Sequence, residues 1–409
     1  MKSILRIVIL IDRMIEGPGG ASDREFVFVV KLSKFCNLRC RYCYEHAELH
    51  VRERMGLATV EKLFADIDKF GEYLSAFGIS PTFSFVWHGG EPLLVPSQYF
   101  REVTALQTKH IRDFPYSNSV QSNLYGSNAS ALAYIIASNW QLGISIDFAP
   151  GVREGRTHRD SHPTVIANAE ALHKSGMAFG VVSTLGKHNA GSIVDAYDWV
   201  EEFAHSWRIL PLFEGGPETA IEELRLPDDE IAEIYSAIFD RRSKGRRHIP
   251  IDPIDGLASA ALLKMAGARD EPDFRRDVLD CVFVVNVNGD IYTRPFAYDA
   301  RHCMGNINVN GMSGLIRSPA YLECQRIIQR GKQENCSVCR HRGYCNSALM
   351  HEHWSVTPKD GRRLCVHPRL GIDAIENELR NAGVDRSTIG AWARNWLGAV
   401  PTELDVPAA

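Results

Sequence analysis

Three cysteines near the start of the chain have a spacing that suits iron–sulfur chemistry. Cys36, Cys40 and Cys43 form a C-x3-C-x2-C pattern directly after the mostly apolar run 26–32. Thiolates are soft ligands that suit iron–sulfur clusters or zinc, and a [4Fe–4S] cluster normally takes four of them. Three thiolates can hold three irons and leave one iron open for a ligand. Zinc sites more often pair their cysteines as C-x2-C, and packed cysteines without a ligand are a third interpretation.

A second group of cysteines lies in the last third of the chain, where seven of the ten occur. This density favours metal or redox chemistry over disulfides in a chain of the cytosol. A C-x2-C-x5-C pattern followed by one more cysteine could bind an iron–sulfur cluster or structural zinc. Those four are Cys336, Cys339, Cys345 and Cys365, and the three that precede them are Cys281, Cys303 and Cys324.

The overall composition argues against several classes of protein. The 409 residues are 45% hydrophobic and 23% charged, which is ordinary for two or three globular domains or one large barrel with an extension. A formal net charge of −4 gives no general attraction to nucleic acid or membranes. The basic run 241–248 is interpreted as a solvated helix end, with contact to an acidic peptide as the alternative. The apolar stretch 1–12 is too short to span a bilayer, so we expect an edge strand of a cytoplasmic protein.

Strand-like and helix-like stretches alternate over about 200 residues. Such alternation predicts an α/β fold, with a parallel sheet and helices outside it. Ligands bind at the carboxyl ends of the strands in sheets of this kind. The predicted strands are 26–32, 82–87, 117–121, 142–147, 179–185 and 207–213, and the predicted helices are 59–74, 97–109, 130–137, 163–174, 192–205 and 227–241.

Polar motifs follow the second, third and fourth predicted strands. They are Gly89-Gly90-Glu91-Pro92, Gln121-Ser122-Asn123 and Ser145-Ile146-Asp147, and the polar loop 156–159 follows the last of them. Paired glycines let a backbone approach a ligand closely, and a carboxylate beside them can accept hydrogen bonds from an ammonium group. Taken alone, the Gly-Gly-Glu-Pro segment could equally be a plain turn.

Together, the three early cysteines and these motifs resemble the radical S-adenosylmethionine (radical SAM) superfamily. In that family the open iron binds SAM, whose reductive cleavage gives a 5′-deoxyadenosyl radical that abstracts hydrogen from an unactivated C–H bond. The resemblance implies a partial (β/α)6 barrel and a catalytic, SAM-binding [4Fe–4S] cluster on Cys36, Cys40 and Cys43. It assigns Tyr42 to the adenine, Gly89, Gly90, Glu91 and Pro92 to the methionyl amine, Ser122 and Asn123 to the ribose, Ser145 and Asp147 to the ribose or carboxylate, and Arg159 to the carboxylate. Leu124 and Phe148 stand where the family usually has glycine.

The second cysteine group resembles a SPASM extension, an auxiliary iron–sulfur domain of peptide-modifying radical SAM enzymes. Its β-hairpin would be 286–292, followed by a Gly-Asn step in 304–307. Arg294 and Leu349 stand where a full SPASM domain has two further cysteines of its first auxiliary cluster. The resemblance therefore implies one auxiliary [4Fe–4S] cluster, on Cys336, Cys339, Cys345 and Cys365. Cys281, Cys303 and Cys324 are then free thiols or ligands of a rearranged site.

This resemblance covers residues 26–370 and suggests how the chain is divided. Residues 214–226 are expected to form a loop over the barrel mouth. A short helix is expected at 258–265, and a helical tail at 373–396 with a break near Gly383. The expected divisions are an N-terminal extension (1–25), the radical SAM partial barrel (26–244), a connector (245–280), a SPASM-like domain (281–370) and a C-terminal tail (371–409).

The segments 26–46 and 88–94 resemble maturases of ribosomally made peptides, most closely those that form cyclophane rings. The resemblance implies abstraction of a side-chain Cβ hydrogen and carbon–carbon cross-linking of a precursor peptide. An external electron donor such as flavodoxin or ferredoxin would be a second partner. The alternatives are formylglycine formation of the sulfatase-maturase type, thioether formation, and a zinc-stapled binding module without enzymatic activity. Sulfatase maturases have an acidic residue after the second SPASM cysteine, where this chain has Arg294-Pro295.

Overall fold

The computed structural model describes residues 22–212, 218–247, 249–267, 281–293, 300–345, 355–356 and 363–385. Strands and helices alternate through its first part, as the sequence predicts. The strands of this part are β1 (Ser22–Ser33), β3 (Ile79–Gly89), β4 (Tyr116–Ser122), β5 (Gln141–Ser145), β7 (Gly180–Leu185) and β8 (Ser206–Pro211). The helices are α2 (Leu57–Ser75), α3 (Ser97–His110), α4 (Ala129–Ala137), α5 (His162–Lys174), α6 (Ala196–Phe203) and α8 (Asp228–Ser243).

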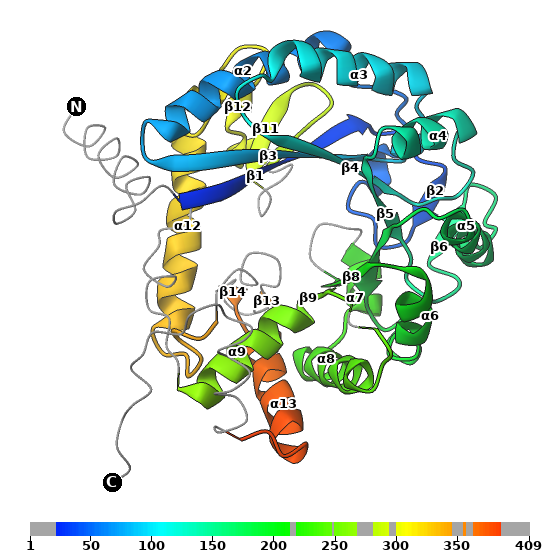
Figure 1. The fold of residues 1–409 in the computed structure, drawn as a ribbon, viewed down its shortest axis with the longest axis vertical. Coiled ribbons are helices and arrows are strands. Elements are labelled where there is room, and N and C mark those ends of the chain that lie inside the picture. Colours follow the sequence, from blue (N-terminus) through cyan, green and yellow to red (C-terminus); the bar gives the residue numbers. More distant parts are fainter. Residues whose placement is uncertain are drawn as a thin grey trace.

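These six strands are parallel neighbours in the order β1-β3-β4-β5-β7-β8. Figure 1 shows them along a curved arc, with the helices on its outer side. Parallel strands bring their carboxyl ends to one edge of the sheet, so the predicted site motifs lie on one side of the molecule. Two short strands, β2 (Leu38–Cys40) and β6 (Arg153–Gly155), pair antiparallel with each other outside the main sheet.

The alternating side chains of β1 explain why this strand lies inside the sheet. Phe26, Phe28, Val30 and Leu32 are at most 2% exposed, and Phe28 stacks on Phe85 of β3 with ring centroids 5.5 Å apart. The buried face of helix α2 packs in the same core. With β3 and β10 (Val282–Val285) both paired to it in parallel, β1 has backbone partners on each side. Successive side chains of a strand point to opposite faces, which accounts for this pattern.

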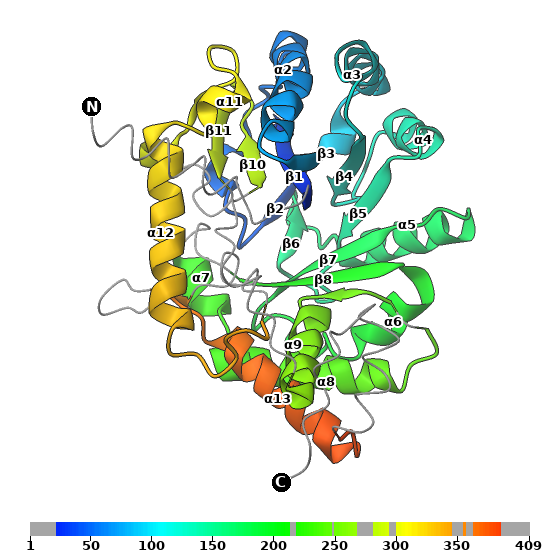
Figure 2. The same cartoon turned by 60° about the vertical axis from the view of Figure 1, so that its left-hand side comes forward.

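The sheet is larger than the sequence predicts, because ten strands join it in the order β12-β11-β10-β1-β3-β4-β5-β7-β8-β9. Strand β9 (Ile251–Asp252) pairs with β8, although it lies in the segment expected to be a connector. The predicted hairpin at 286–292 forms, with β10 and β11 (Asp290–Thr293) as its strands. Strand β12 (Gly305–Asn306) follows β11. The cysteine-rich part therefore begins within the barrel's own sheet (Figure 2).

Other parts of the described chain are more helical than expected. The segment 214–226, interpreted as a loop, contains helix α7 (Glu218–Leu224), so that prediction was wrong for these residues. The short helix predicted at 258–265 is longer, α9 (Ile254–Ala266). The tail helix α13 (His367–Asn381) ends before Gly383, whose φ of 78° matches the predicted break. Positive φ favours glycine at a helix end.

The remaining elements of the described chain follow. They are the 3-10 turns at His46–Glu48, Pro92–Leu94 and Ala300–His302, helices α11 (Met312–Leu315) and α12 (Pro319–Cys336), and strands β13 (Ser355–Val356) and β14 (Arg363–Leu364). The expected edge strand at 1–12 and the positions Arg294 and Leu349 lie outside the described residues. No helix among the described residues is long and apolar enough to cross a membrane. The division of the chain into domains stays a prediction.

Candidate active site

The loop that carries the first three cysteines is fixed at both ends by backbone pairing. The Cys36 amide donates to the Leu49 carbonyl at 3.1 Å, and the Cys43 amide donates to the Cys40 carbonyl at 3.1 Å. Between them, β2 pairs with β6, which places Cys40 opposite Arg153. The loop after β5 therefore holds the cysteine loop in position.

The donor set of this loop fits an iron–sulfur cluster. The three thiols share one small cluster with Leu38 and Leu49. Burial, followed by the charges of Glu91 and the other thiols, raises the pKa of Cys36 to about 12. Burial and Cys40 likewise raise the pKa of Cys43 to about 12. Three thiols gathered on one loop are the donor set that an iron–sulfur cluster takes, and a bound metal would ionise them in spite of their burial.

The two glycines after β3 allow its end to press against the cysteine loop. The Gly90 amide donates to the Ser33 carbonyl at 2.7 Å, and the Glu91 amide donates to the Phe35 carbonyl at 2.9 Å. A Cβ on Gly89 would lie 2.1 Å from the Ser33 oxygen, and one on Gly90 would lie 2.3 Å from the Phe35 oxygen. Any larger residue would push the two loops apart. The close approach that the structure shows is between two segments of this chain, and approach of this backbone to a ligand stays a prediction.

The carboxylate of Glu91 is buried and bound by three donors of the protein. Its Oε1 accepts from the Leu93 amide at 2.9 Å and from the Ser122 hydroxyl at 2.8 Å. Its Oε2 accepts from the Asn123 amide at 2.7 Å. Burial raises the pKa of Glu91, while these hydrogen bonds oppose the shift. Pro92, also buried, begins the short turn that presents Leu93. This arrangement joins the predicted amine-binding and ribose-binding motifs through one side chain.

Asn123 connects the same motifs to the cluster loop. Its side-chain amide donates to Asn37 Oδ1 at 2.9 Å and lies 3.6 Å from the Cys36 sulfur. Ser145, at the end of β5, accepts a hydrogen bond from Gln121 at 2.8 Å. The structure therefore brings the motifs after the second, third and fourth strands to one edge beside the cysteines. Their contacts with SAM stay predictions.

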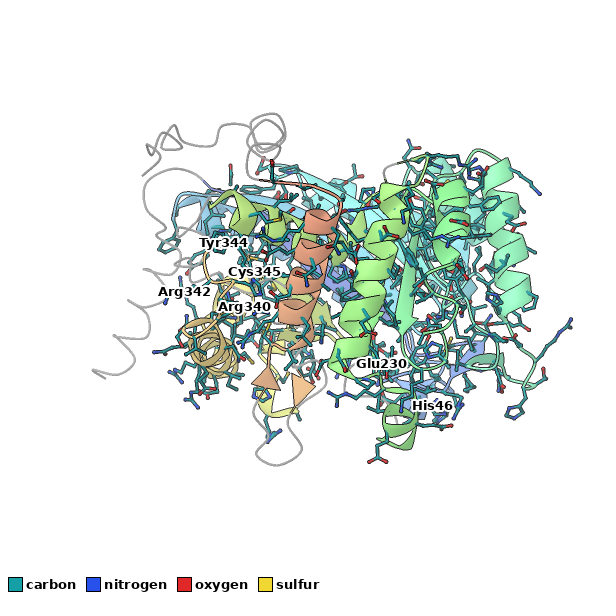
Figure 3. All side chains as sticks on the ribbon, turned by 90° about the horizontal axis from the view of Figure 1, so that it is seen from below. His46, Glu230, Arg340, Arg342, Tyr344 and Cys345 are labelled. Carbon is teal, nitrogen blue, oxygen red and sulfur yellow. The ribbon has the colours of Figure 1, made fainter. Side chains whose placement is uncertain are left out.

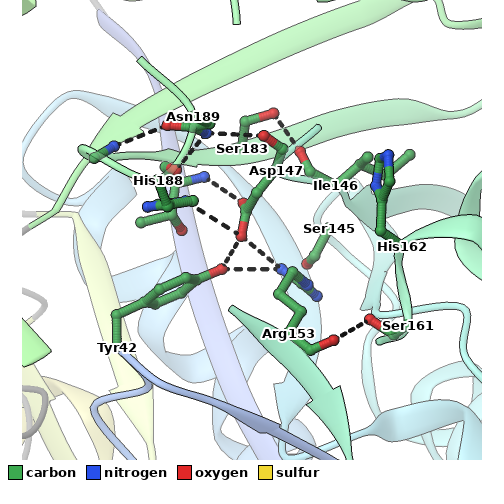
Figure 4. Close-up of polar contacts among 12 residues, drawn as sticks. Tyr42, Ser145, Ile146, Asp147, Arg153, Ser161, His162, Ser183, His188 and Asn189 are labelled. Atoms are coloured by element: carbon green, nitrogen blue, oxygen red, sulfur yellow. Dashed lines mark hydrogen bonds and ion pairs between the residues drawn. The ribbon is translucent and has the colours of Figure 1, made fainter. Parts of the chain in front are cut away.

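Asp147 is the centre of a buried polar network (Figure 4). Its Oδ1 accepts from the Thr184 amide at 2.8 Å, and its Oδ2 accepts from the Tyr42 hydroxyl. The guanidinium of Arg153 lies 3.7 Å from Oδ2 and donates to the Tyr42 oxygen at 3.2 Å. His188 Nε2 lies 3.9 Å from the same carboxylate oxygen. Burial and the Asp147 charge raise the pKa of Tyr42, so its phenol stays protonated and can donate.

Two basic residues at this site were not found by reading the sequence. Arg153 is buried beside Asp147, whereas the side chain of Arg159, the residue selected from the sequence, is exposed. The neighbouring Arg156 and His158 are exposed as well. The signal for Arg153 is its pairing opposite Cys40, which the linear sequence does not reveal. His188 follows the fifth predicted strand, where the sequence shows no recognised motif.

The two positions where glycine is usual in the family keep a left-handed backbone. Leu124 has a φ of 52° and Phe148 a φ of 56°. For residues with a side chain this conformation costs on the order of 1–2 kcal/mol. Phe148 packs edge-on against Trp199 and Trp207, with ring centroids 5.4 and 6.0 Å away. These aromatic contacts offset the strain, so the backbone keeps a glycine-like turn without glycine.

A second buried cluster lies on the other side of Cys43. Lys31 is 3% exposed, and its ammonium lies 3.0 Å from Glu45 Oε1 and 3.2 Å from His88 Nδ1. It also donates to the Tyr44 hydroxyl. Burial and the nearby Lys31 charge lower the pKa of His88 to about 3, so the imidazole is neutral at pH 7. The segments 26–46 and 88–94 thus meet in one polar cluster next to a cluster-binding cysteine.

The later cysteines also come together. Cys336 ends α12, and the Cys365 amide donates to the side-chain oxygen of Asn335 at 3.1 Å. Burial, with the charges of Cys339 and Cys345, raises the pKa of Cys336 to about 11. Burial and Cys345 raise that of Cys365 to about 12. One thiol can shift the pKa of another only when the two are near, so these cysteines lie close together. Figure 3 labels Cys345 together with its neighbours in this region.

Arg369, in the first turn of α13, is a cationic residue beside this second cysteine set, and the charge of Lys332 also acts on Cys336. The Arg369 guanidinium donates to the Asn335 carbonyl at 2.6 Å, and its charge lowers the pKa of Cys365 against the effect of burial. Its Nε has no hydrogen-bond partner among the described residues. Cys324 is packed with Ile328 in a separate buried patch of α12, and Cys303 contacts the Gly305 carbonyl. The described part of the chain has no group of three or more His, Cys, Asp or Glu side chains already arranged to hold one metal ion.

Comparison with known proteins identifies the family. Residues 30–200 match the model of the radical SAM superfamily. A serine-type anaerobic sulfatase-maturating enzyme of Klebsiella pneumoniae is 34% identical over 384 residues, which are 90% of this chain and 91% of that protein. The chain belongs to the radical SAM superfamily. It is an enzyme of the peptide-modifying group that includes the anaerobic sulfatase-maturating enzymes. A serine-type relative from Bacteroides thetaiotaomicron is 23% identical over 359 residues, 81% of this chain and 84% of that protein.

Solved structures show the same fold for this radical SAM enzyme. The sulfatase-maturating enzyme anSMEcpe, with bound AdoMet and the Cp18Cys peptide, has a TM-score of 0.70 at 19% identity. That likeness covers 91% of this chain and 99% of the other, including the cysteine-rich C-terminal region. SuiB of Streptococcus suis, bound to its precursor peptide SuiA, has a TM-score of 0.57 at 13% identity and covers 85% and 75% of the two chains. The α/β fold with its parallel sheet is thus the fold of radical SAM maturases. SAM and a [4Fe–4S] cluster are the cofactors of the enzyme.

Proposed function

We propose that this enzyme cross-links a ribosomally made precursor peptide by joining a side-chain β-carbon to an aromatic ring carbon, a cyclophane-type bond. The observation that carries the proposal is the meeting of Glu45 and His88 through Lys31 beside Cys43. These residues come from the two segments, 26–46 and 88–94, that resemble cyclophane-forming maturases. Bound peptides in the structures of two similar enzymes support a peptide as the substrate class.

The reaction removes two hydrogens from the peptide. Cys36, Cys40 and Cys43 would hold the cluster that, with SAM bound, would supply the radical chemistry for removal of the Cβ hydrogen atom, with 5′-deoxyadenosine as the product that carries this hydrogen. The carbon–carbon bond would then form at the ring, whose hydrogen would leave as a proton while one electron would pass to an iron–sulfur cluster. The Lys31 ammonium and the Gly89 amide both donate to His88 Nδ1, so the neutral ring carries its hydrogen on Nε2 and can donate a hydrogen bond from there.

The second cysteine set is proposed to bind the electron-accepting cluster. Cys336, Cys339, Cys345 and Cys365 provide the four thiolates that an ordinary [4Fe–4S] cluster takes. Arg369 adds a positive charge beside them, which favours electron uptake. The other electron, which cleaves SAM, is proposed to come from an external flavodoxin or ferredoxin. Residues 281–370 are proposed to form a SPASM-type domain around this cluster.

Formylglycine formation is the second candidate, because of the similarity to the Klebsiella pneumoniae serine-type enzyme over nearly the whole chain. On a serine, this reaction would also remove a Cβ hydrogen atom, a hydroxyl proton and one electron, leaving an aldehyde. Arg294-Pro295 stand where sulfatase maturases have the second SPASM cysteine and the acidic residue after it, which argues against this reaction from the sequence. Thioether formation would instead require a cysteine in the substrate.

The test uses the reconstituted enzyme with SAM, dithionite and two peptides. One is a synthetic peptide that contains aromatic residues, with deuterium at the β-carbons of the residues next to them. The other is a peptide with one serine in a sulfatase-type motif. Deuterium in 5′-deoxyadenosine and loss of backbone fragments between two joined residues would support cross-linking. An aldehyde that reacts with a hydrazide, formed only from the serine peptide, would contradict it and favour the second candidate.

Metal analysis separates the cluster assignments. We expect about eight irons with matching acid-labile sulfide in the wild type, for two [4Fe–4S] clusters. The triple variant lacking Cys36, Cys40 and Cys43 should keep about four irons and form no 5′-deoxyadenosine. A content near twelve irons would mean that Cys281, Cys303 and Cys324 build a further cluster. Zinc without sulfide at the second set would exclude an auxiliary cluster.

A further inference from the structure

The surface around the first cysteine loop is basic, although the chain as a whole is acidic. The segments 31–54 and 153–160 contain nine Lys or Arg and five Asp or Glu, whereas the whole chain has a formal net charge of −4. Four arginines of these two segments have exposed side chains and form no ion pair within the described chain. They are Arg52, Arg54, Arg156 and Arg159.

Two other basic regions of the described chain have carboxylates of the protein as partners. Arg241, in the basic run 241–248, lies 2.9 Å from Asp195 and also binds Asp198. On α12, which leads into the second cysteine set, Arg326 lies 2.8 Å from Glu323. The arginines beside the first cysteine loop differ, because no carboxylate among the described residues pairs with them. Their positive charge is therefore available to a partner from outside.

Phe35, the residue before Cys36, lies at the centre of this basic surface. Its half-buried ring has its centroid 5.4 Å from the guanidinium carbon of Arg52 and 5.8 Å from that of Arg156. These two arginines come from distant segments, which the pairing of β2 with β6 brings together. Arg39 adds a third guanidinium, which donates to the Cys36 carbonyl at 2.9 Å. An aromatic ring and three cationic groups thus lie against the backbone of the cysteine loop.

The place of this surface points to the kind of partner that it fits. Reductive cleavage of SAM takes one electron, which must reach the cluster that the first three cysteines hold. Electron transfer slows steeply with distance, so an electron carrier has to dock close to those cysteines. Unpaired arginines attract an anionic partner and speed its encounter with the protein. An acidic peptide would also be attracted, but its binding would gain nothing from closeness to the cluster.

We propose that the surface around Phe35, with Arg39, Arg52 and Arg156, is the docking site of a small acidic electron-carrier protein. The carrier gives up one electron, the oxidised cluster takes it up, and no atom is transferred. The proposal rests on the proposed external electron donor and assigns it to the first cysteine loop instead of the auxiliary side. It does not depend on the cross-linking reaction, so a different peptide product leaves it intact.

The test reverses the charge of the two arginines that flank Phe35. The reconstituted double variant, Arg52→Glu with Arg156→Glu, is titrated with an acidic flavodoxin and an acidic ferredoxin at low and high salt. Two reversed charges should weaken binding roughly tenfold at low salt, and the difference should shrink at high salt because salt screens exposed charges. Formation of 5′-deoxyadenosine with the reduced carriers should fall in parallel, whereas formation with dithionite should match the wild type.

A matched double variant tests entry of the electron at the auxiliary side. Arg326→Glu with Arg330→Glu, both exposed on α12, should bind the two carriers as the wild type does. If Arg52→Glu with Arg156→Glu lowers the iron content, Gln at the same two positions replaces Glu and the same titration decides.

Four results would overturn the proposal. They are failure of both carriers to bind the wild type, unchanged binding in the variant beside Phe35, an equal or larger loss in the α12 variant, and retained carrier binding together with weakened binding of an acidic peptide. The last result would assign the surface to a peptide. Because only carrier binding and SAM cleavage without peptide are needed, failure here is distinct from failure of the cross-linking reaction.

Discussion

Replacement of Glu91 tests two opposed roles for the same carboxylate. The sequence predicts that it binds the methionyl amine of SAM, so that Glu91→Ala would weaken SAM binding roughly 10–100-fold while the protein kept its iron. The structure places the carboxylate on the Leu93 and Asn123 amides and the Ser122 hydroxyl. We expect instead that the protein itself becomes less stable.

The size of this effect follows from the donors left without partners. An unsatisfied buried donor costs about 1–3 kcal/mol. Glu91→Ala leaves two buried amides, those of Leu93 and Asn123, while the Ser122 hydroxyl can rotate, so the loss should be about 2–6 kcal/mol. A typical domain has about 5–15 kcal/mol in total. Glu91→Gln keeps one carbonyl oxygen and removes a charge whose burial is unfavourable, so it should cost about 1–3 kcal/mol.

Denaturant unfolding followed by circular dichroism measures this difference on the iron-free and the reconstituted protein. Glu233→Ala, an exposed glutamate of α8, is the matched control and should change little. Both Glu91 variants should unfold at lower denaturant, Ala before Gln, and the Ala variant should lose iron as well as SAM affinity. The reasoning is refuted if Glu91→Ala unfolds like the wild type and keeps its iron but binds SAM at least tenfold more weakly.

Three further predictions concern charged groups. Arg153→Met should lower both thermal stability and SAM affinity, because the Asp147 carboxylate loses its buried cation. The exposed Arg159→Met variant should change neither quantity. A loss of SAM affinity in Arg159→Met alone would restore the sequence-based assignment. His88 has a folded pKa of about 3 against an ordinary 6.5, so protonation favours unfolding. The wild type should lose up to about 1.4 kcal/mol of stability per pH unit as the pH falls from 6.5 towards 3. His88→Gln should remove that slope in unfolding titrations. Arg369→Met should lower the reduction potential of the auxiliary cluster, because removing a positive charge favours the oxidised form. The potential is measured in the triple cysteine variant, which lacks the first cluster. An unchanged potential would show that the guanidinium does not act on the auxiliary cluster.

The strongly periodic elements and the local motifs could be predicted from the sequence. Strand β1 was evident because residues 26–32 are a mostly apolar run. The three cysteines of the first loop come together because they are close in the chain. What could not be predicted depends on pairing between distant segments. Strand β9 has two residues, too few for a period, and β10 joins β1 across about 250 residues of chain.

The polar side chains of the site show the same limit. Arg159 was selected because it lies in a polar loop, while Arg153 is buried because β6 pairs with β2. Leu124 and Phe148 stand where the family usually has glycine, yet the backbone of both residues keeps a positive φ. A residue type gives only a preference for such a backbone, and the surrounding contacts decide whether the cost is met. His188 has no motif at all and is recognised only by the two nitrogens that the fold leaves unbonded.

The hydrogen bonds also explain which functions can be separated by mutation. Glu91 holds Asn123, and Asn123 contacts both Asn37 and the Cys36 sulfur, so changes in the amine or ribose motifs should reach the cluster loop. Arg153 lies opposite Cys40 on the paired strands β6 and β2, so a change at Arg153 should also reach the cluster loop. The His188 side chain forms no such hydrogen bond within the described residues. Loss of its nitrogens should therefore disturb the cluster loop less than changes at Glu91, Asn123 or Arg153, as long as an aromatic ring remains to stack on Tyr42.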